Sequence, residues 1–195
     1  MTDEILEAEH REVAVVKAEP VEVVQIFPKD PIEAMEEAQR IVKYMAKHCT
    51  GKGFISPIKN KKYPKVEWWT TIGSSLGLFA VPKYAHRLDR KDEIAYDARV
   101  EVFRNGQLIT AGEAICSSKE AKWRNSDEYA IKSMAITRAT AKAFRTNLAF
   151  MAALAGLEAT PAEEVVHGFE EKREQKKQQK KQTKKYPSDW NKDQN

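Results

Sequence analysis

The sequence lacks the long apolar runs and the cysteine motifs that identify several large protein classes. No stretch approaches the ~20 apolar residues that a membrane-spanning helix needs. The first residues, MTDEILEAEHREV, are acidic and have no apolar core, so we do not expect them to act as a signal peptide. The 195-residue chain has only two cysteines, Cys49 and Cys116, and neither lies in a CxxC spacing. These features predict a soluble, cytoplasmic protein with free thiols and no membrane partner.

Motifs of nucleotide and metal chemistry are also missing. Neither GxxxxGK[ST] nor a GxGxxG after a strand occurs, so a nucleotide-hydrolysing motor is not expected. The four histidines, which match no metal-ligand spacing, are His10, His48, His86 and His167. Acidic pairs at residues 92–93 and 163–164 are expected on exposed turns. The sequence predicts no catalytic residue, no cofactor and no bound metal, although a metal-dependent nuclease built from distant carboxylates stays open as an alternative.

What the sequence does have is a high charge density that is unevenly distributed. Charged residues make up 32% of the chain, and the formal net charge is +4. Residues 168–195 hold nine Lys and Arg against five Asp and Glu, whereas the residues before them carry 24 of each sign. Any basic surface on the folded part must therefore come from local clustering. We expect one domain over residues 1–168 and a disordered, basic, Lys- and Gln-rich tail over residues 169–195.

Local signals in the N-terminal part predict strands, a helix and a hairpin. Residues 11–27 are rich in β-branched side chains and predict one or two strands. Asp30 is placed to act as an N-cap with Pro31 after it, so a helix is expected over residues 31–48. Two short β-like runs around the polar loop 59–62 predict a small hairpin, and the segment VEWWTTIGSSLGLF after it predicts a short helix.

The middle of the chain predicts three antiparallel strands and a long helix. The strands are expected over residues 79–89, 93–104 and 107–117. Asn105-Gly106, between the last two strands, is the preferred sequence of a type I′ hairpin turn. The long helix is expected over residues 126–156, and a further short helix after Thr160-Pro161. The predicted fold is therefore α+β, with a three-stranded antiparallel meander packed on one long helix, a β-β-β-α core, and additional N-terminal elements.

The predicted long helix carries a narrow stripe of cations. At ~100° per residue, Arg138, Lys142 and Arg145 lie within about 60° of one another, and no acidic residue stands four positions away from any of them. The stripe is thus arranged for an anion such as a nucleic-acid backbone, although the solvated face of a core helix is the simpler alternative. Abundant small residues around the stripe would let a neighbouring backbone or ligand approach closely. An adjacent apolar face is expected from Tyr129, Ala141, Phe144, Leu148 and Met151.

A second cluster lies between the third strand and the long helix. It consists of Lys119, Lys122, Trp123 and Arg124. Cations interleaved with an aromatic ring offer a single strand both phosphate neutralisation and a stacking plane. The structural alternative is that the indole closes the core at the entry of the helix.

The predicted hairpin contributes a third cluster, which consists of Lys59, Lys61, Lys62, Tyr63 and Lys65. These lysines either follow a phosphate backbone or protect an exposed strand edge from aggregation. In the short helix that follows, Trp68 and Trp69 are adjacent, and neighbouring residues do not share a helix face. We therefore expect one indole in the core and the other against a subunit interface or a base.

The segments VEWWTTIGSSLG, AYDARVEVFRNGQLITAGEA and DEYAIKSMAITRATAKAFRTNLAF, in this order, resemble the single-strand annealing proteins of phages, the superfamily of the Erf, Sak and RecT/Redβ groups. The residues of the long helix that follow that superfamily's pattern are Ala135, Thr137, Ala139, Lys142 and Ala143. A closer resemblance, through W-x-T-hydrophobic-G and ATPAEE at 159–164, is to an uncharacterised family of phage and prophage proteins. The sequence departs from the superfamily at Lys142-Ala143, where a Lys-Arg pair is common.

The resemblance implies a homo-oligomer, a ring or a filament, that acts in phage-type homologous recombination. A basic groove would hold single-stranded DNA with its bases available, so that a complementary strand anneals without ATP. Annealing needs backbone neutralisation, stacking surfaces and high local concentration but no bond chemistry, so no enzymatic activity is expected. The tail would add electrostatic capture, or dock a host or phage replication protein through Tyr186, Pro187 and Trp190. The alternatives are a phage structural or assembly protein, in which the cationic helix makes subunit contacts, and the nuclease.

Overall fold

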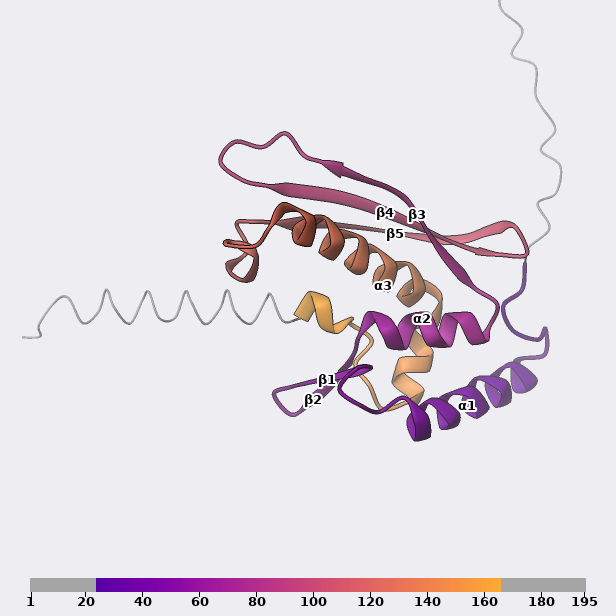
Figure 1. The fold of residues 1–195 in the computed structure, drawn as a ribbon. Coiled ribbons are helices and arrows are strands. Elements are labelled where there is room, and N and C mark those ends of the chain that lie inside the picture. Colours follow the sequence, from indigo (N-terminus) through magenta and orange to yellow (C-terminus); the bar gives the residue numbers. More distant parts are fainter. Residues whose placement is uncertain (1–23, 166–195) are drawn as a thin grey trace, which may run out of the picture.

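The computed structural model describes residues 24–165 and shows an α+β fold (Figure 1). The helices are α1 (Pro31–His48), α2 (Val66–Ser75) and α3 (Glu128–Leu154), with a 3-10 turn, η1 (Ala121–Trp123), before α3. The strands are β1 (Ile55–Ile58), β2 (Lys61–Pro64), β3 (Phe79–Arg87), β4 (Ala95–Arg104) and β5 (Gln107–Ser117). The predicted fold class is confirmed, because β3, β4 and β5 form an antiparallel meander that packs on α3, and β1 pairs with β2.

Local signals set the limits of α1 and of the β4–β5 hairpin. The Oδ1 atom of Asp30 accepts hydrogen bonds from the backbone N–H groups of Ile32 (2.8 Å) and Glu33 (3.0 Å), so α1 begins where the sequence predicts. Asn105 and Gly106 have positive φ angles of 50° and 78°. Both residues of a tight type I′ turn need this conformation, which explains why the dipeptide identified the hairpin.

The sheet approaches α3 most closely where β5 crosses the helix. Ala135, Ala139 and Ala143 recur at every fourth position of α3 and are fully buried. A Cβ atom added at Gly112 would lie 2.4 Å from the carbonyl oxygen of Ala139 and 2.4 Å from the backbone nitrogen of Ala143. The small residues of α3 thus admit a neighbouring backbone rather than a ligand.

The two faces of the sheet differ in what covers them. The helices α1, α2 and α3 all lie on one side of the three-stranded sheet (Figure 1), and Val100 and Val102 are buried on that side. On the opposite face Arg99 pairs with Glu101 (3.2 Å) and Glu113 (2.6 Å). The strand register places four exposed apolar side chains on this same face: Phe79, Val81, Leu108 and Ile115.

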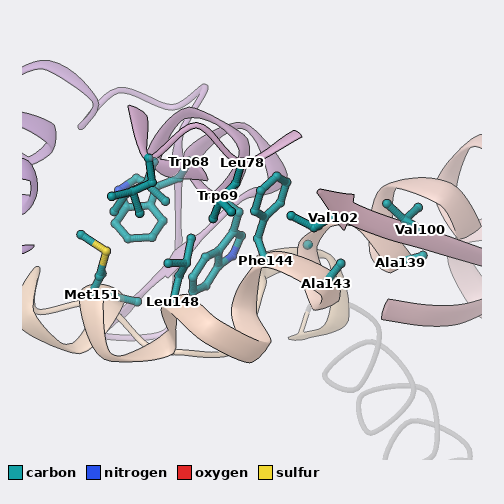
Figure 2. Close-up of a cluster of buried hydrophobic side chains, with 14 of the residues drawn as sticks. Trp68, Trp69, Leu78, Val100, Val102, Ala139, Ala143, Phe144, Leu148 and Met151 are labelled. Atoms are coloured by element: carbon teal, nitrogen blue, oxygen red, sulfur yellow. The ribbon is translucent and has the colours of Figure 1, made fainter. Parts of the chain in front are cut away.

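Both tryptophans of α2 belong to the core, which corrects the expectation that only one would. Trp68 is 1% exposed and Trp69 is fully buried, and their rings meet edge to face with centroids 5.0 Å apart. Figure 2 shows Trp69 between Phe144 and Leu148 of α3, with Trp68 on the side of Met151. Neither indole is therefore available to a base or to another subunit.

The ends of the chain carry the remaining predictions. Of residues 11–27, the structure describes only 24–27, which form no strand, so most of the predicted N-terminal strand region lies outside the described residues. A short helix after Thr160-Pro161 is confirmed at residues 162–165, and the predicted tail at 169–195 lies outside the described residues. Within residues 24–165, every helix is too short or too polar to cross a membrane.

Candidate nucleic-acid interface

Arg138, the first cation of the predicted stripe, faces the interior rather than solvent. The residue is only 7% exposed. Its Nη1 atom donates to Glu120 Oε1 at 2.8 Å and to the carbonyl oxygen of Ile115 at 2.9 Å, and its Nη2 atom donates to Glu120 Oε2 at 2.5 Å. This bidentate pair ties η1, β5 and α3 together. The sequence prediction is corrected here, because Arg138 is committed to an internal partner that stands 18 residues away in the chain.

The rest of the stripe is also less open than the sequence suggests. Arg145 is half-exposed, and its Nη1 atom lies 3.4 Å from Glu164 Oε2. Lys142 is half-buried and has no acidic partner among residues 24–165. Tyr129, expected on the apolar face beside the stripe, is 73% exposed instead, because α2 covers only the C-terminal part of α3 (Figure 1). Lys142 is thus the one stripe cation that the described residues leave unpaired.

The cluster between β5 and α3 is divided between surface and core. Lys119, Lys122 and Arg124 are exposed, whereas Trp123 is half-buried and packs against the hydrophobic core. The Nζ atom of Lys122 lies 5.2 Å from the centroid of the Trp123 ring. The half-buried indole packs against the core at the entry of α3, which favours the structural alternative, and the DNA-binding role of this cluster stays a prediction.

The hairpin lysines have two different roles. The hairpin is confirmed, but its turn is only residues 59–60, because Lys61 and Lys62 belong to β2. Lys61 Nζ lies 2.9 Å from Glu158 Oε1, and this hydrogen bond raises the pKa of the Lys61 ammonium group. The backbone N–H of Glu158 also donates to the carbonyl oxygen of Lys62 at 2.9 Å. Lys61 thus fastens the hairpin to the segment after α3, while the side chains of Lys59 and Lys62 are exposed.

The structure places the hairpin beside the C-terminal half of α1, which is basic and belongs to none of the three predicted clusters. Residues 38–66 contain eight Lys and Arg and no Asp or Glu. They form the C-terminal part of α1 and the β1–β2 hairpin, which line one cavity from two sides. We call the exposed part of this segment the α1–hairpin surface, which consists of Arg40, Lys43, Tyr44, Lys47, Lys52, Lys59 and Lys62. The signal was readable in the sequence, as a long run without acidic residues.

The same surface carries exposed aromatic rings. Tyr44 is 64% exposed, and its ring centroid lies 4.4 Å from that of His48. At ~100° per residue, Lys43, Tyr44 and Lys47 fall within about 100° of one another on α1. Cations and an open aromatic plane therefore share one face of the helix, which is the combination that a single strand needs.

A groove on the other side of β1 has a mixed character. It has a volume of about 500 Å³ and brings Lys65 and Lys122 together with Glu163. Glu163 Oε1 accepts a hydrogen bond from the backbone N–H of Val66 at 2.9 Å and so caps α2, and burial raises the pKa of the Glu163 carboxyl group. Glu163 and Glu164 are thus half-buried and engaged, not on an exposed turn as expected. The two carboxylates that line this groove, Glu67 and Glu163, make it less suited to a phosphate than the α1–hairpin surface.

A metal site and similarity to known proteins would each indicate a function, and neither is found for the described residues and the sequence. Among residues 24–165, no group of three or more His, Cys, Asp or Glu side chains is placed to hold a metal ion. No protein-family model matches the chain, and the curated proteins and the solved structures yield no significant match either. The resemblance to single-strand annealing proteins therefore stays a prediction.

Proposed function

We propose that the chain binds single-stranded DNA on the α1–hairpin surface. The observation that carries this proposal is the stretch of residues 38–66, with eight cations and no acid, folded into two adjacent elements. Within residues 24–165, no acidic side chain pairs with Lys43, Lys47, Lys52 or Lys62. Four exposed ammonium groups in one region attract a chain of phosphates, and binding them releases counterions from the strand.

Tyr44 supplies the second element of single-strand binding. Base stacking on an aromatic ring tolerates any sequence, because every base has a flat face. The ring lies among Lys43 and Lys47 on α1, so one nucleotide can stack there while its neighbours' phosphates meet the lysines. This arrangement supports binding that is independent of sequence.

The proposal extends to ATP-independent annealing by a homo-oligomer. Annealing needs many protein chains on one strand. The open face of the sheet supports self-association, because it exposes Phe79, Val81, Leu108 and Ile115 on the side opposite α3. The DNA surface and this apolar face lie on different elements, so one does not compete with the other.

Replacing Tyr44 with alanine is expected to weaken binding of a labelled oligo-dT strand roughly tenfold, because one stacked base is lost. Alanine favours a helix, so α1 should keep its structure. The measurement is fluorescence anisotropy of the full chain at low salt.

Tyr129→Ala is the matched control, because Tyr129 is an exposed tyrosine in the first turn of another helix, α3. It should bind the strand like the wild type. Equal losses in the two variants, or a wild type that does not bind oligo-dT, would count against the proposed surface.

A further inference from the structure

The α1–hairpin surface opens onto a cavity of about 350 Å³. The cavity lies between the end of α1, the β1–β2 hairpin and the residues that follow α3. Its walls are mainly apolar, with Met45, Trp68 and Leu157 among the lining side chains. A volume of this size is at the lower end of the range for small-molecule sites.

In the described part of the chain, the charged groups that line the cavity are two lysines, Lys52 and Lys62. Among residues 24–165, no carboxylate lines it, unlike the groove beside β1, where Glu67 and Glu163 take part. Two ammonium groups beside apolar walls suit a ligand with an anionic end and a flat apolar body. A nucleoside monophosphate unit has this chemistry.

We propose that this cavity accepts one base of the bound strand, with the attached phosphate between Lys52 and Lys62. The proposal rests on the proposed function, because these two lysines belong to the α1–hairpin surface. A strand that follows the surface passes the mouth of the cavity, and one nucleotide turns inward. Free deoxynucleotides present the same chemistry and should enter at higher concentration.

Two cysteines provide a direct readout of occupancy. Cys49 lines the cavity and is 8% exposed, so a small thiol reagent can reach it from there. Cys116 is fully buried in the core, and burial raises its pKa to about 11. Thiolate is the reactive form, so Cys116 stays unmodified while the protein is folded and reports any unfolding.

The experiment follows the rate at which Cys49 in the full chain reacts with a small aromatic disulfide reagent. An oligo-dT strand at about ten times its dissociation constant should slow the reaction about tenfold. An abasic strand of the same length carries the phosphates without the bases and should leave the rate nearly unchanged. Free dTMP at saturating concentration should protect Cys49, whereas inorganic phosphate should not.

A variant that fills the cavity separates this proposal from the proposed function. Ala46 lines the cavity from an exposed position on α1, so Ala46→Trp should block the mouth without disturbing the core. It should itself slow the reaction of Cys49, leave no further slowing by dTMP, and keep salt-sensitive strand binding through the remaining lysines. If oligo-dT binds but protects Cys49 no better than the abasic strand, the cavity proposal is overturned and the binding surface stands. If dTMP fails to protect, the cavity proposal falls whether or not the strand binds.

Discussion

Arg138→Ala is expected to destabilise the fold by about 3–5 kcal/mol, because it removes the guanidinium group that neutralises a largely buried carboxylate. Glu120 would lose both bonds to the guanidinium group, at 2.8 and 2.5 Å. The link between η1, β5 and α3 would go with them. Urea unfolding followed by the fluorescence of the buried indoles measures this directly.

Arg145→Ala is the matched control for Arg138, since it removes an arginine from the same helix. Its pair with Glu164 is longer, at 3.4 Å, and both side chains are partly exposed. The expected loss is about 0–1 kcal/mol. A double variant, Arg138→Met with Glu120→Leu, should recover much of the stability, because it removes both charges together. An Arg138→Ala protein as stable as the wild type would contradict the structural role.

The ion pair between Arg138 and Glu120 also affects any DNA-binding measurement on variants of Arg138. A variant of the whole predicted stripe would lose DNA binding simply because less protein is folded. Only binding measured at equal folded fraction can separate a DNA contact from a structural one. The structural role assigned to Arg138 predicts that the folded fraction of Arg138→Ala binds oligo-dT like the wild type.

Gly112→Ala is expected to cost at least ~3 kcal/mol, since overpacking against a backbone has no cheap relief. The added methyl group would lie 2.4 Å from the backbone atoms of Ala139 and Ala143. These are main-chain atoms of α3 in the middle of the core, so the helix and β5 must separate along their whole contact. A clearly lower midpoint of urea unfolding than that of the wild type is the expected result.

Gly51→Ala serves as the control for the glycine variant. A Cβ atom at Gly51 meets nothing within 4 Å, so the change in stability should stay within about 0.5 kcal/mol. Similar unfolding midpoints for Gly112→Ala and Gly51→Ala would show that β5 does not approach α3 as closely as described.

The elements that the sequence predicts well are those fixed by neighbouring residues. Asp30 caps α1 through N–H groups two and three residues ahead, and Asn105-Gly106 makes its turn alone. The three strands and α3 were predicted to within two residues at each end. These signals need no knowledge of the rest of the chain.

The features that the sequence could not predict depend on distant residues. Arg138 was assigned to a surface stripe because its partner, Glu120, is outside its helix. One of Trp68 and Trp69 was expected in the core and the other outside it. Both indoles are buried, because α2 has packing partners on more than one side. The stretch of residues 38–66 without acidic residues is a different case, because it can be seen in the sequence. That its lysines share one surface follows only from the structure, in which α1 and the hairpin line the same cavity.

The most direct test of the α1–hairpin surface is the salt dependence of oligo-dT binding by two triple variants of equal net charge. One carries Lys47→Gln, Lys52→Gln and Lys62→Gln, and the other carries Lys29→Gln, Lys91→Gln and Lys132→Gln, three exposed lysines on other parts of the described chain. The slope of log affinity against log salt should fall by about 2 for the first variant, at ~0.7 per lost phosphate contact, and stay at the wild-type value for the second. Equal slopes in the two variants would mean that the tail or the overall charge holds the strand, and the proposed surface would be wrong.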